Sequence, residues 1–218
     1  MKHQILEDLR WRHATKKFDS TKKVAKDDLD ILFEAMRLSA SSINSQPWQF
    51  IVIESNEARE RLDKTFSQKF HYNQPHVFDC SQIILFAHNP RYIYENFAEV
   101  VDKYIEDRRI KLEDREKAFA SFMYVELNTD EKGNTGNWTK AQIYLALGNT
   151  LHTLARLRID STPLEGIDAK LVNEEFKKEL GGYRCEVALA IGYHHAQDDY
   201  NAKLPKSRLS LNRIFKHI

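Results

Sequence analysis

Cysteine, glycine, proline and long apolar runs are all scarce in this sequence. Its 218 residues include 2 cysteines, 7 glycines and 5 prolines. Cys80 and Cys185 lie far apart and lack the C-x-x-C spacing of zinc sites and redox dithiols. We expect both to be small buried hydrophobes in a reducing cytosol, with a disulfide or a nucleophilic thiol as the alternatives.

No stretch of the sequence predicts a membrane span or an export signal. The apolar runs IILFA and VALAIGY are much shorter than a bilayer-crossing helix. The first residues, MKHQILEDLR, mix both charge signs and contain no apolar signal core. These absences predict a cytoplasmic protein with no membrane partner.

Neither charge sign is in excess. The chain has 33 basic and 32 acidic residues, a formal net charge of +1. Such a balance provides no global field to attract nucleic acid, so any basic site must be local. Nucleic-acid binding through the segment RWRHATKKF is therefore the weakest functional alternative.

The remaining composition predicts one domain over residues 1–218, because a chain that is 42% hydrophobic can bury a sizeable core. Apolar spacing predicts helices over 5–12, 27–39 and 169–180, and a long helix from Trp138. In that long helix we expect one apolar stripe, with close packing at Gly148. Strands are predicted over 49–55, 81–88 and 186–195, and helices within 92–130. Ser55 and Asp168 are predicted helix N-caps.

Several common catalytic motifs are missing. The sequence contains no G-x-x-x-x-G-K-[ST], no G-x-G-x-x-G and no G-x-S-x-G. Kinases, Rossmann enzymes and serine hydrolases are therefore less favoured as function classes. His194 and His195 are adjacent on a predicted strand and would point to opposite faces, so we expect no metal site.

Four polar segments remain as candidate sites. Arg12, His13 and Lys16 follow the first helix and could face one anion, and the segment PKSR carries two cations two residues apart. The segment SASSINSQPW is rich in hydroxyls and amides, and TPLEG can aim backbone N–H groups. For each segment the alternative is an ordinary solvated turn or tail.

Taken in order, these segments resemble the FMN-dependent nitroreductase family, specifically its oxygen-insensitive NAD(P)H nitroreductase and dihydropteridine reductase branch. The matching blocks are RHATKKFD, SASSINSQPWQFIV, YNQPHVFDCSQIILF, WTKAQIYLALGN, TPLEGID, VALAIGYHH and NAKLPKSRL. The resemblance implies an α+β fold with a central, mainly antiparallel sheet flanked by helices. It also implies an intertwined homodimer, in which residues 198–218 form a C-terminal arm that packs on the partner subunit.

The resemblance also implies roles for individual residues. The residues similar to those that hold the FMN phosphate are Arg12, Lys206 and Arg208. His13 and Lys16 would lie beside the ribityl chain and the pyrimidine edge. Residues matching partner-subunit contacts are Ser41, Ser42 and Asn44, and residues matching further flavin contacts are Asn73, Gln142, Pro163, Leu164, Glu165 and Gly166. Glu165 and Gly166 are the implied catalytic pair, with backbone N–H presented toward the flavin N5.

Two positions depart from the family pattern. His76 stands where close relatives carry lysine near the flavin, and Ala14 replaces a hydroxyl residue beside the phosphate. A histidine can titrate where a lysine would not. The implied activity is two-electron ping-pong transfer from NAD(P)H through FMN to nitroaromatics, quinones, pterins or similar acceptors. The alternative is a flavin-binding or sensor protein with little turnover.

Overall fold

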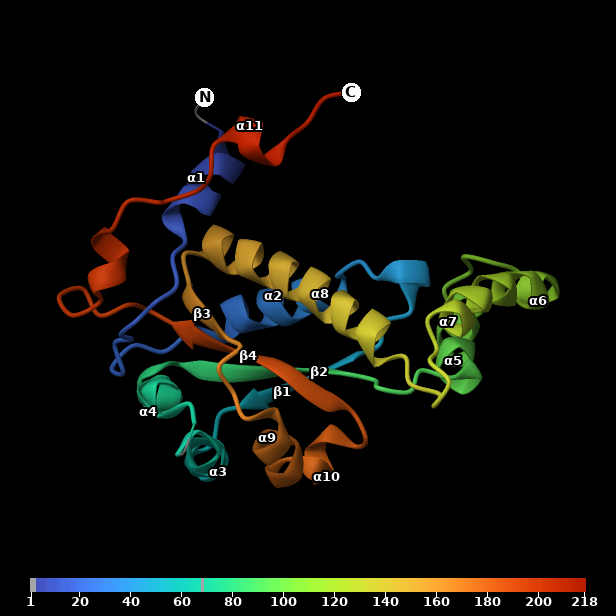
Figure 1. The fold of residues 1–218 in the computed structure, drawn as a ribbon, viewed down its shortest axis with the longest axis horizontal. Helices are drawn as coiled ribbons and strands as arrows, with labels where there is room; N and C mark the ends of the chain where they lie inside the picture. Colours follow the sequence, from blue (N-terminus) through green and yellow to red (C-terminus); the bar gives the residue numbers. More distant parts are fainter. Residues whose placement is uncertain (1–2, 68) are drawn as a thin grey trace.

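The computed structural model describes residues 3–67 and 69–218. Within them, one four-stranded sheet has the order β1-β2-β4-β3, and every neighbouring pair is antiparallel (Figure 1). The strands are β1 Trp48–Ile53, β2 Gln82–His88, β3 Asp160–Leu164 and β4 Arg184–Gly192. The expected α+β fold class with a mainly antiparallel sheet is confirmed.

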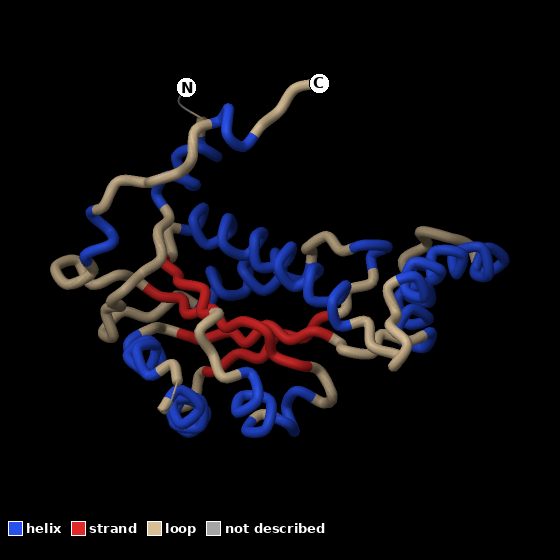
Figure 2. The backbone as a smooth tube through the Cα atoms, in the orientation of Figure 1, coloured by secondary structure: helices blue, strands red, loops and turns tan. Residues whose placement is uncertain are grey.

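Helices cover both faces of this sheet. The α-helices are α1 Gln4–Trp11, α2 Lys26–Arg37, α3 Asn56–Phe66, α4 Gln74–Asp79, α5 Tyr94–Glu106, α6 Arg115–Ala118, α7 Met123–Leu127, α8 Gly136–Leu157, α9 Ala169–Glu175, α10 Lys177–Leu180 and α11 Leu211–Ile214. Short 3-10 turns are η1 Ser42–Asn44, η2 His71–Asn73, η3 Leu112–Asp114, η4 Phe119–Phe122 and η5 Tyr200–Lys203. Helices α2 and α8 cover one face, and α3, α4, α9 and α10 cover the other (Figure 2).

The central strands explain the apolar runs in the sequence. On β2, Ile83 and Leu85 join the core under α3 and α9, whereas Ile84 and Phe86 join the core under α2 and α8. The β4 residues alternate in the same way, because successive side chains of a strand point to opposite faces. A strand buried on both faces needs apolar residues at nearly every position, so periodicity of two is lost from the sequence.

Local sequence signals fix several element ends. The Ser55 side chain accepts a hydrogen bond from the Ala58 N–H, and Asp168 accepts from Lys170 and Leu171, so both predicted N-caps are confirmed. Gly181 ends α10 with a φ of 53°, a conformation that glycine adopts without steric cost. The helix predicted over 169–180 is broken at Phe176 into α9 and α10.

Within the described residues of one chain, the close packing expected at Gly148 of α8 is not found. Tyr144 and Leu145 are 40% and 55% exposed, and a Cβ placed at Gly148 would have no described atom within 4 Å. The sheet instead receives Ile143, Leu147 and other residues of the neighbouring face. The helix has more than one apolar face, and the sequence pattern alone does not say which one meets the sheet of the same chain.

A second small core supports an excursion from the main body. The chain between β2 and α8 forms α5, α6 and α7, which stand apart at one end of the molecule (Figure 1). Phe97, Val101, Val125 and Trp138 are the centre of this core. The helices expected within residues 92–130 are therefore present.

The two cysteines and the C-terminal segment occupy opposite environments. Cys80 and Cys185 are free and buried, and burial raises the pKa of Cys185 to about 12. Every residue from Lys203 to Ile218 is exposed, including Leu209 and Phe215.

Among the described residues, no helix has the length and apolar character to cross a bilayer.

The central position of β4 predicts a large cost for a cavity there. Leu189→Ala removes a fully buried side chain from the core under α2 and α8. We expect the free energy of unfolding to fall by about 2–5 kcal/mol. Urea unfolding at matched protein concentration measures it. Leu112→Ala is the control, since Leu112 is 71% exposed; equal unfolding midpoints for the two variants would contradict this account of the core.

Candidate functional site

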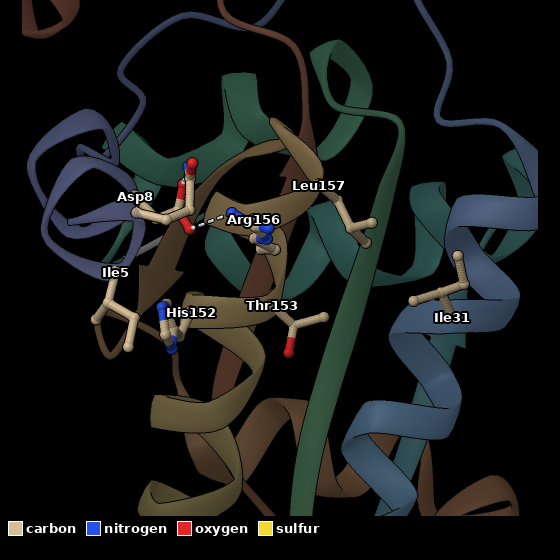
Figure 3. A pocket seen from close by; sticks show the side chains of 8 residues that line it. Ile5, Asp8, Ile31, His152, Thr153, Arg156 and Leu157 are labelled. Carbon is tan, nitrogen blue, oxygen red and sulfur yellow. Dashed lines mark hydrogen bonds and ion pairs between the residues drawn. The ribbon is translucent and has the colours of Figure 1, made fainter.

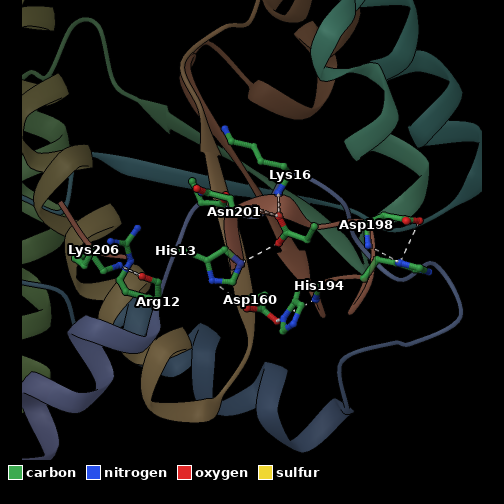
Figure 4. Close-up of polar contacts among 11 residues, drawn as sticks. Arg12, His13, Lys16, Asp160, His194, Asp198, Asn201 and Lys206 are labelled. Atoms are coloured by element: carbon green, nitrogen blue, oxygen red, sulfur yellow. Dashed lines mark hydrogen bonds and ion pairs between the residues drawn. The ribbon is translucent and has the colours of Figure 1, made fainter. Parts of the chain in front are cut away.

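Three cations from the two ends of the chain gather beside the end of α1. Arg12 is the C-cap of α1, and the Lys206 ammonium donates a hydrogen bond to its carbonyl oxygen (Figure 4). Burial and then the charge of Arg208 lower the pKa of Arg12. Burial, Arg12 and Arg208 likewise lower the pKa of Lys206. Like charges crowded in this way raise the free energy of the site unless an anion joins them.

One buried atom indicates where that anion fits. The Nε of Arg12 is shielded from solvent and has no hydrogen-bond partner among the described residues. An unsatisfied buried donor costs roughly 1–3 kcal/mol, and a phosphate oxygen would remove that cost. The residues therefore fit a phosphate group, in agreement with the predicted grouping of Arg12, Lys206 and Arg208.

A buried carboxylate holds the neighbouring segments together. Asp199 is fully buried, and its Oδ2 lies 2.9 Å from the Nε2 of His13. Its Oδ1 accepts from the backbone N–H of Lys16 at 3.2 Å and of Asn201 at 3.1 Å. The Asn201 amide also donates to the Ala14 carbonyl at 2.7 Å. Asp199 and Asn201 were not among the predicted site residues, because His13, Ala14 and Lys16 are far away from them in sequence.

A second carboxylate lies on the other side of His13. The Oδ2 of Asp160 accepts from the backbone N–H of His194 at 3.0 Å and lies 2.8 Å from its Nδ1. Its Oδ1 is buried without a described hydrogen-bond partner, 3.9 Å from the His13 Nδ1. His194 lies after the end of β4 at Gly192, so the predicted placement of both histidines on a strand was wrong. The ligand atoms of His13, Asp160 and His194 lie within 4.8 Å of one another.

His13 and Lys16 behave differently from each other. The His13 ring is engaged by Asp199 and packs edge-on against His194, with 5.5 Å between ring centroids. Lys16 is exposed, and its side chain extends away from His13 (Figure 4). Lys16 is thus available to a ligand, whereas the His13 side chain already contacts Asp199 and His194.

A tight turn follows β3, which contains Pro163 and Leu164. The Gly166 carbonyl accepts from the Asn73 amide at 2.7 Å. A Cβ at Gly166 would lie 2.6 Å from the Tyr72 hydroxyl and 2.9 Å from the Asn73 Nδ2. Only glycine fits there without a shift of these neighbours. Asn73 uses one of its two amide N–H donors in this bond, so its second N–H and its amide oxygen remain for the predicted ring contact.

Glu165 is exposed, and a hydrogen bond holds its side chain. Its Oε1 accepts a hydrogen bond from the Tyr144 hydroxyl at 2.7 Å. Burial and then this carboxylate raise the pKa of Tyr144. Tyr144 comes from the exposed face of α8, so that face and the Glu165–Gly166 turn are linked.

The serine-rich segment forms a strained but well-bonded loop. Ile43, Asn44 and Gln46 have φ values of 50°, 53° and 44°. These values lie in the left-handed backbone region, which is unfavourable for residues other than glycine. The Ser41 hydroxyl accepts from the Gln46 N–H at 3.0 Å, and the Gln142 side chain accepts from the Ser42 N–H at 2.8 Å. The structure thus brings Gln142 to this loop.

In a single chain this loop is far from the cation cluster. Gln142 lies near the start of α8, whereas Arg156 and Arg158 at its end bind Asp8 of α1. Fourteen residues of helix separate Gln142 from Arg156, roughly 21 Å at 1.5 Å per residue. Ser41, Ser42 and Asn44 therefore do not join Arg12 within one chain.

A hollow of about 370 Å³ lies between α1, α2 and α8 (Figure 3). Ile5, Ile31 and Leu157 contribute apolar walls, and His152 continues the exposed face of α8. No residue of the predicted flavin site is among the residues that line it. We therefore assign this hollow to the surface rather than to the candidate active site.

Comparison with known proteins gives matches over nearly the whole chain. Residues 9–193 match the model of the Nitroreductase family. The chain is 57% identical over 214 residues to the major NAD(P)H-flavin oxidoreductase of Aliivibrio fischeri, with 98% of each protein covered. It is 33% identical over 210 residues to the oxygen-insensitive NAD(P)H nitroreductase of Enterobacter cloacae, covering 93% of this chain and 94% of that protein.

Solved structures give the same fold. A protein of Exiguobacterium sibiricum, assigned as a nitroreductase and crystallised in complex with FMN, matches with a TM-score of 0.82 and 22% identity. The match covers 100% of this chain and 99% of that one. At this identity the likeness establishes the fold alone.

The environment of His76 predicts a loss of stability in acid. Burial, and then the charge of Lys16, lower its pKa from the ordinary value of 6.5. The unfolded chain therefore binds the proton first as pH falls, and the free energy of unfolding decreases below about pH 6.5. His76→Gln should lose less unfolding free energy than the wild type between about pH 7.5 and about pH 5, on the scale of 1.36 kcal/mol for each unit of lowered pKa.

Urea unfolding at a series of pH values measures the effect. His217→Gln is the matched control, since His217 is exposed and should leave the pH dependence unchanged. His88 is also buried with a lowered pKa, so some acid sensitivity remains in the His76 variant. Parallel pH curves for the wild type and His76→Gln would show that His76 is not the group responsible.

Proposed function

The chain belongs to the nitroreductase family, and we propose from this premise that it is an FMN-dependent oxidoreductase taking electrons from NAD(P)H. The observation that carries the proposal is the cation cluster of Arg12, Lys206 and Arg208, in which the buried Nε of Arg12 has no hydrogen-bond partner in the described part of the chain. This cluster has the charge and the hydrogen-bonding capacity to hold a flavin phosphate. The names of the two relatives, a flavin oxidoreductase and a nitroreductase, support the same reaction class.

We infer that the site residues divide the work between binding and orientation. Arg12, Lys206 and Arg208 would hold the phosphate. Lys16 would place positive charge where a bound electron acceptor gains negative charge. When bound, FMN supplies the two-electron chemistry, and the protein provides orientation and electrostatics.

The Glu165–Gly166 turn would then orient the reacting face. Its backbone is fixed by the Asn73 amide, and its carboxylate is fixed by the Tyr144 hydroxyl. A rigid turn aims its N–H groups without reorganisation during reaction. Nitroaromatics, quinones and pterins are the acceptor class we propose, in the cytoplasm, where the two buried thiols would stay reduced.

We further propose that two copies of the chain complete each site. The exposed face of α8, including Tyr144, Leu145 and Gly148, continues through His152 into the hollow beside Ile5 and Ile31, as residues three or four apart share one helix face. An apolar surface of this kind on α1, α2 and α8 favours a second copy as its cover.

Two-fold symmetry gives the second copy a specific role. If the α8 helices of two copies pack antiparallel across a two-fold axis, the start of one lies beside the end of the other. The loop with Ser41, Ser42 and Asn44 would then approach the cation cluster of the partner. The exposed arm after η5, with Leu209 and Phe215, would pack on the same partner.

The proposed activity is tested by the visible absorption spectrum of the purified protein. We expect flavin bands that bleach in one two-electron step on anaerobic addition of NADH or NADPH and return when a quinone or nitroaromatic is added. The donor that bleaches faster identifies the preferred nicotinamide. A protein that binds FMN but is bleached by neither donor would contradict the reductase proposal, and one that FMN cannot reconstitute would contradict the flavin site.

The proposed dimer is tested by Leu145→Arg, which places a charge in the middle of the exposed α8 face. We expect the variant to elute as a monomer and to lose most of its FMN, because each site would lack the partner's loop. Sedimentation velocity and the flavin-to-protein absorbance ratio measure both effects. Leu112→Arg is the control, since Leu112 is also an exposed leucine but lies in the excursion between α5 and α6. A dimeric Leu145→Arg protein with full FMN would contradict this arrangement.

A further inference from the structure

The cations of the phosphate site come from two segments that are far apart in the sequence. Arg12 precedes the segment 13–16, whereas Lys206 and Arg208 belong to the arm that follows η5. Any ligand held by all three requires these segments to keep one fixed spacing. What fixes that spacing is therefore part of the binding machinery, although it does not touch the ligand.

Asp199 makes the connection. It is fully buried, and its two oxygens receive the His13 Nε2 and the backbone N–H of Lys16 from one segment. The same carboxylate accepts the Asn201 N–H and is the N-cap of η5 in the other segment. Hydrogen bonds to a buried carboxylate are among the strongest that a protein makes.

The arm has little else to hold it. Every residue from Lys203 onward is exposed, so the arm has no buried anchor after η5 in the described chain. Asn201 adds one bond, from its amide to the Ala14 carbonyl. Lys206 itself donates to the Arg12 carbonyl at the cation cluster, and at η5 the direction in which Lys206 and Arg208 leave depends on the contacts of Asp199 and Asn201.

Asp160 supports the same connection from behind. Its Oδ2 contacts the backbone N–H and the Nδ1 of His194, and its Oδ1 faces His13. The imidazole of His13 therefore lies between the buried carboxylates of Asp160 and Asp199. The spacing of His13, Asp160 and His194 is also that of a metal site. However, the His13 Nε2 and the His194 Nδ1 already lie within hydrogen-bond distance of carboxylate oxygens, which favours a hydrogen-bonded network.

We propose that Asp199 is a positioning residue of the phosphate site, supported by His13 and Asp160. It fixes Lys206 and Arg208 against Arg12 and so sets the affinity for the phosphate group of the bound ligand. This inference rests on the proposed FMN site, because the ligand phosphate is taken to be that of FMN.

The test compares FMN with riboflavin, which has the same ring and ribityl chain but no phosphate. Dissociation constants for both are measured by flavin fluorescence quenching on the full-length protein after flavin removal, with circular dichroism to confirm folding. Asp199→Asn should weaken FMN binding by about tenfold, the scale of one lost charge-assisted contact, and leave riboflavin binding nearly unchanged. Asp198→Asn, at the neighbouring exposed carboxylate, should change neither.

Two further variants separate the possible failures. Arg208→Ala should also lower the preference for FMN over riboflavin. If Arg208→Ala does so and Asp199→Asn does not, the positioning role is overturned and the FMN site stands. If the wild type binds FMN no better than riboflavin, the proposed phosphate site itself falls.

A milder variant keeps the test decisive if Asp199→Asn does not fold. Asn201→Ala removes only the bond to the Ala14 carbonyl and should shift the preference in the same direction by a smaller factor. Equal losses for FMN and riboflavin in either variant would indicate a general structural role and overturn the proposal. A loss of FMN affinity on treatment with EDTA would also overturn it, by making the histidine and aspartate group a metal centre.

Discussion

The antiparallel pairing of β2 with β4 is the contact on which the rest of the molecule depends. It joins residues 82–88 to residues 184–191, with one register shift between Phe86 and Ala87. Both strands are buried on two faces, so their backbone polar groups have to be satisfied by the ladder itself. The site follows from this pairing, because β3 adds to the free edge of β4 and brings Asp160 opposite Gly192.

The chain then leaves β4 directly into the site. Asp19 and Tyr193 are hydrogen-bonded through their backbones, as are His195 and Lys17, so the segment after Arg12 is held along the segment after β4. Arg12 immediately precedes the first segment, and the second segment leads through η5 to Lys206 and Arg208. The β2–β4 pairing in the core thus positions the segments that lead to the cation cluster at the surface.

Residues close together in sequence were predictable, and contacts between distant residues were not. Helix α2 and the caps at Ser55 and Asp168 followed from spacing and side-chain type. The exposure of the α8 face around Gly148 within one chain was not predictable, because a single chain's sequence does not reveal which apolar face packs internally. The carboxylates of Asp199 and Asp160 were missed for another reason, since His13 is 186 positions away from Asp199. The family resemblance supplied Arg12, Lys206 and Arg208, which isolated charge patterns could not distinguish from a solvated tail.

The burial of both cysteines has a practical consequence for studying the arm. Cys80 and Cys185 are 0% and 1% exposed, and burial raises the pKa of each thiol. A maleimide reacts with exposed thiolates, so the native chain should remain unmodified under mild conditions. A cysteine introduced near the exposed C-terminus would then be the single reactive position, and a fluorophore there would report directly on whether the arm lies against its neighbour.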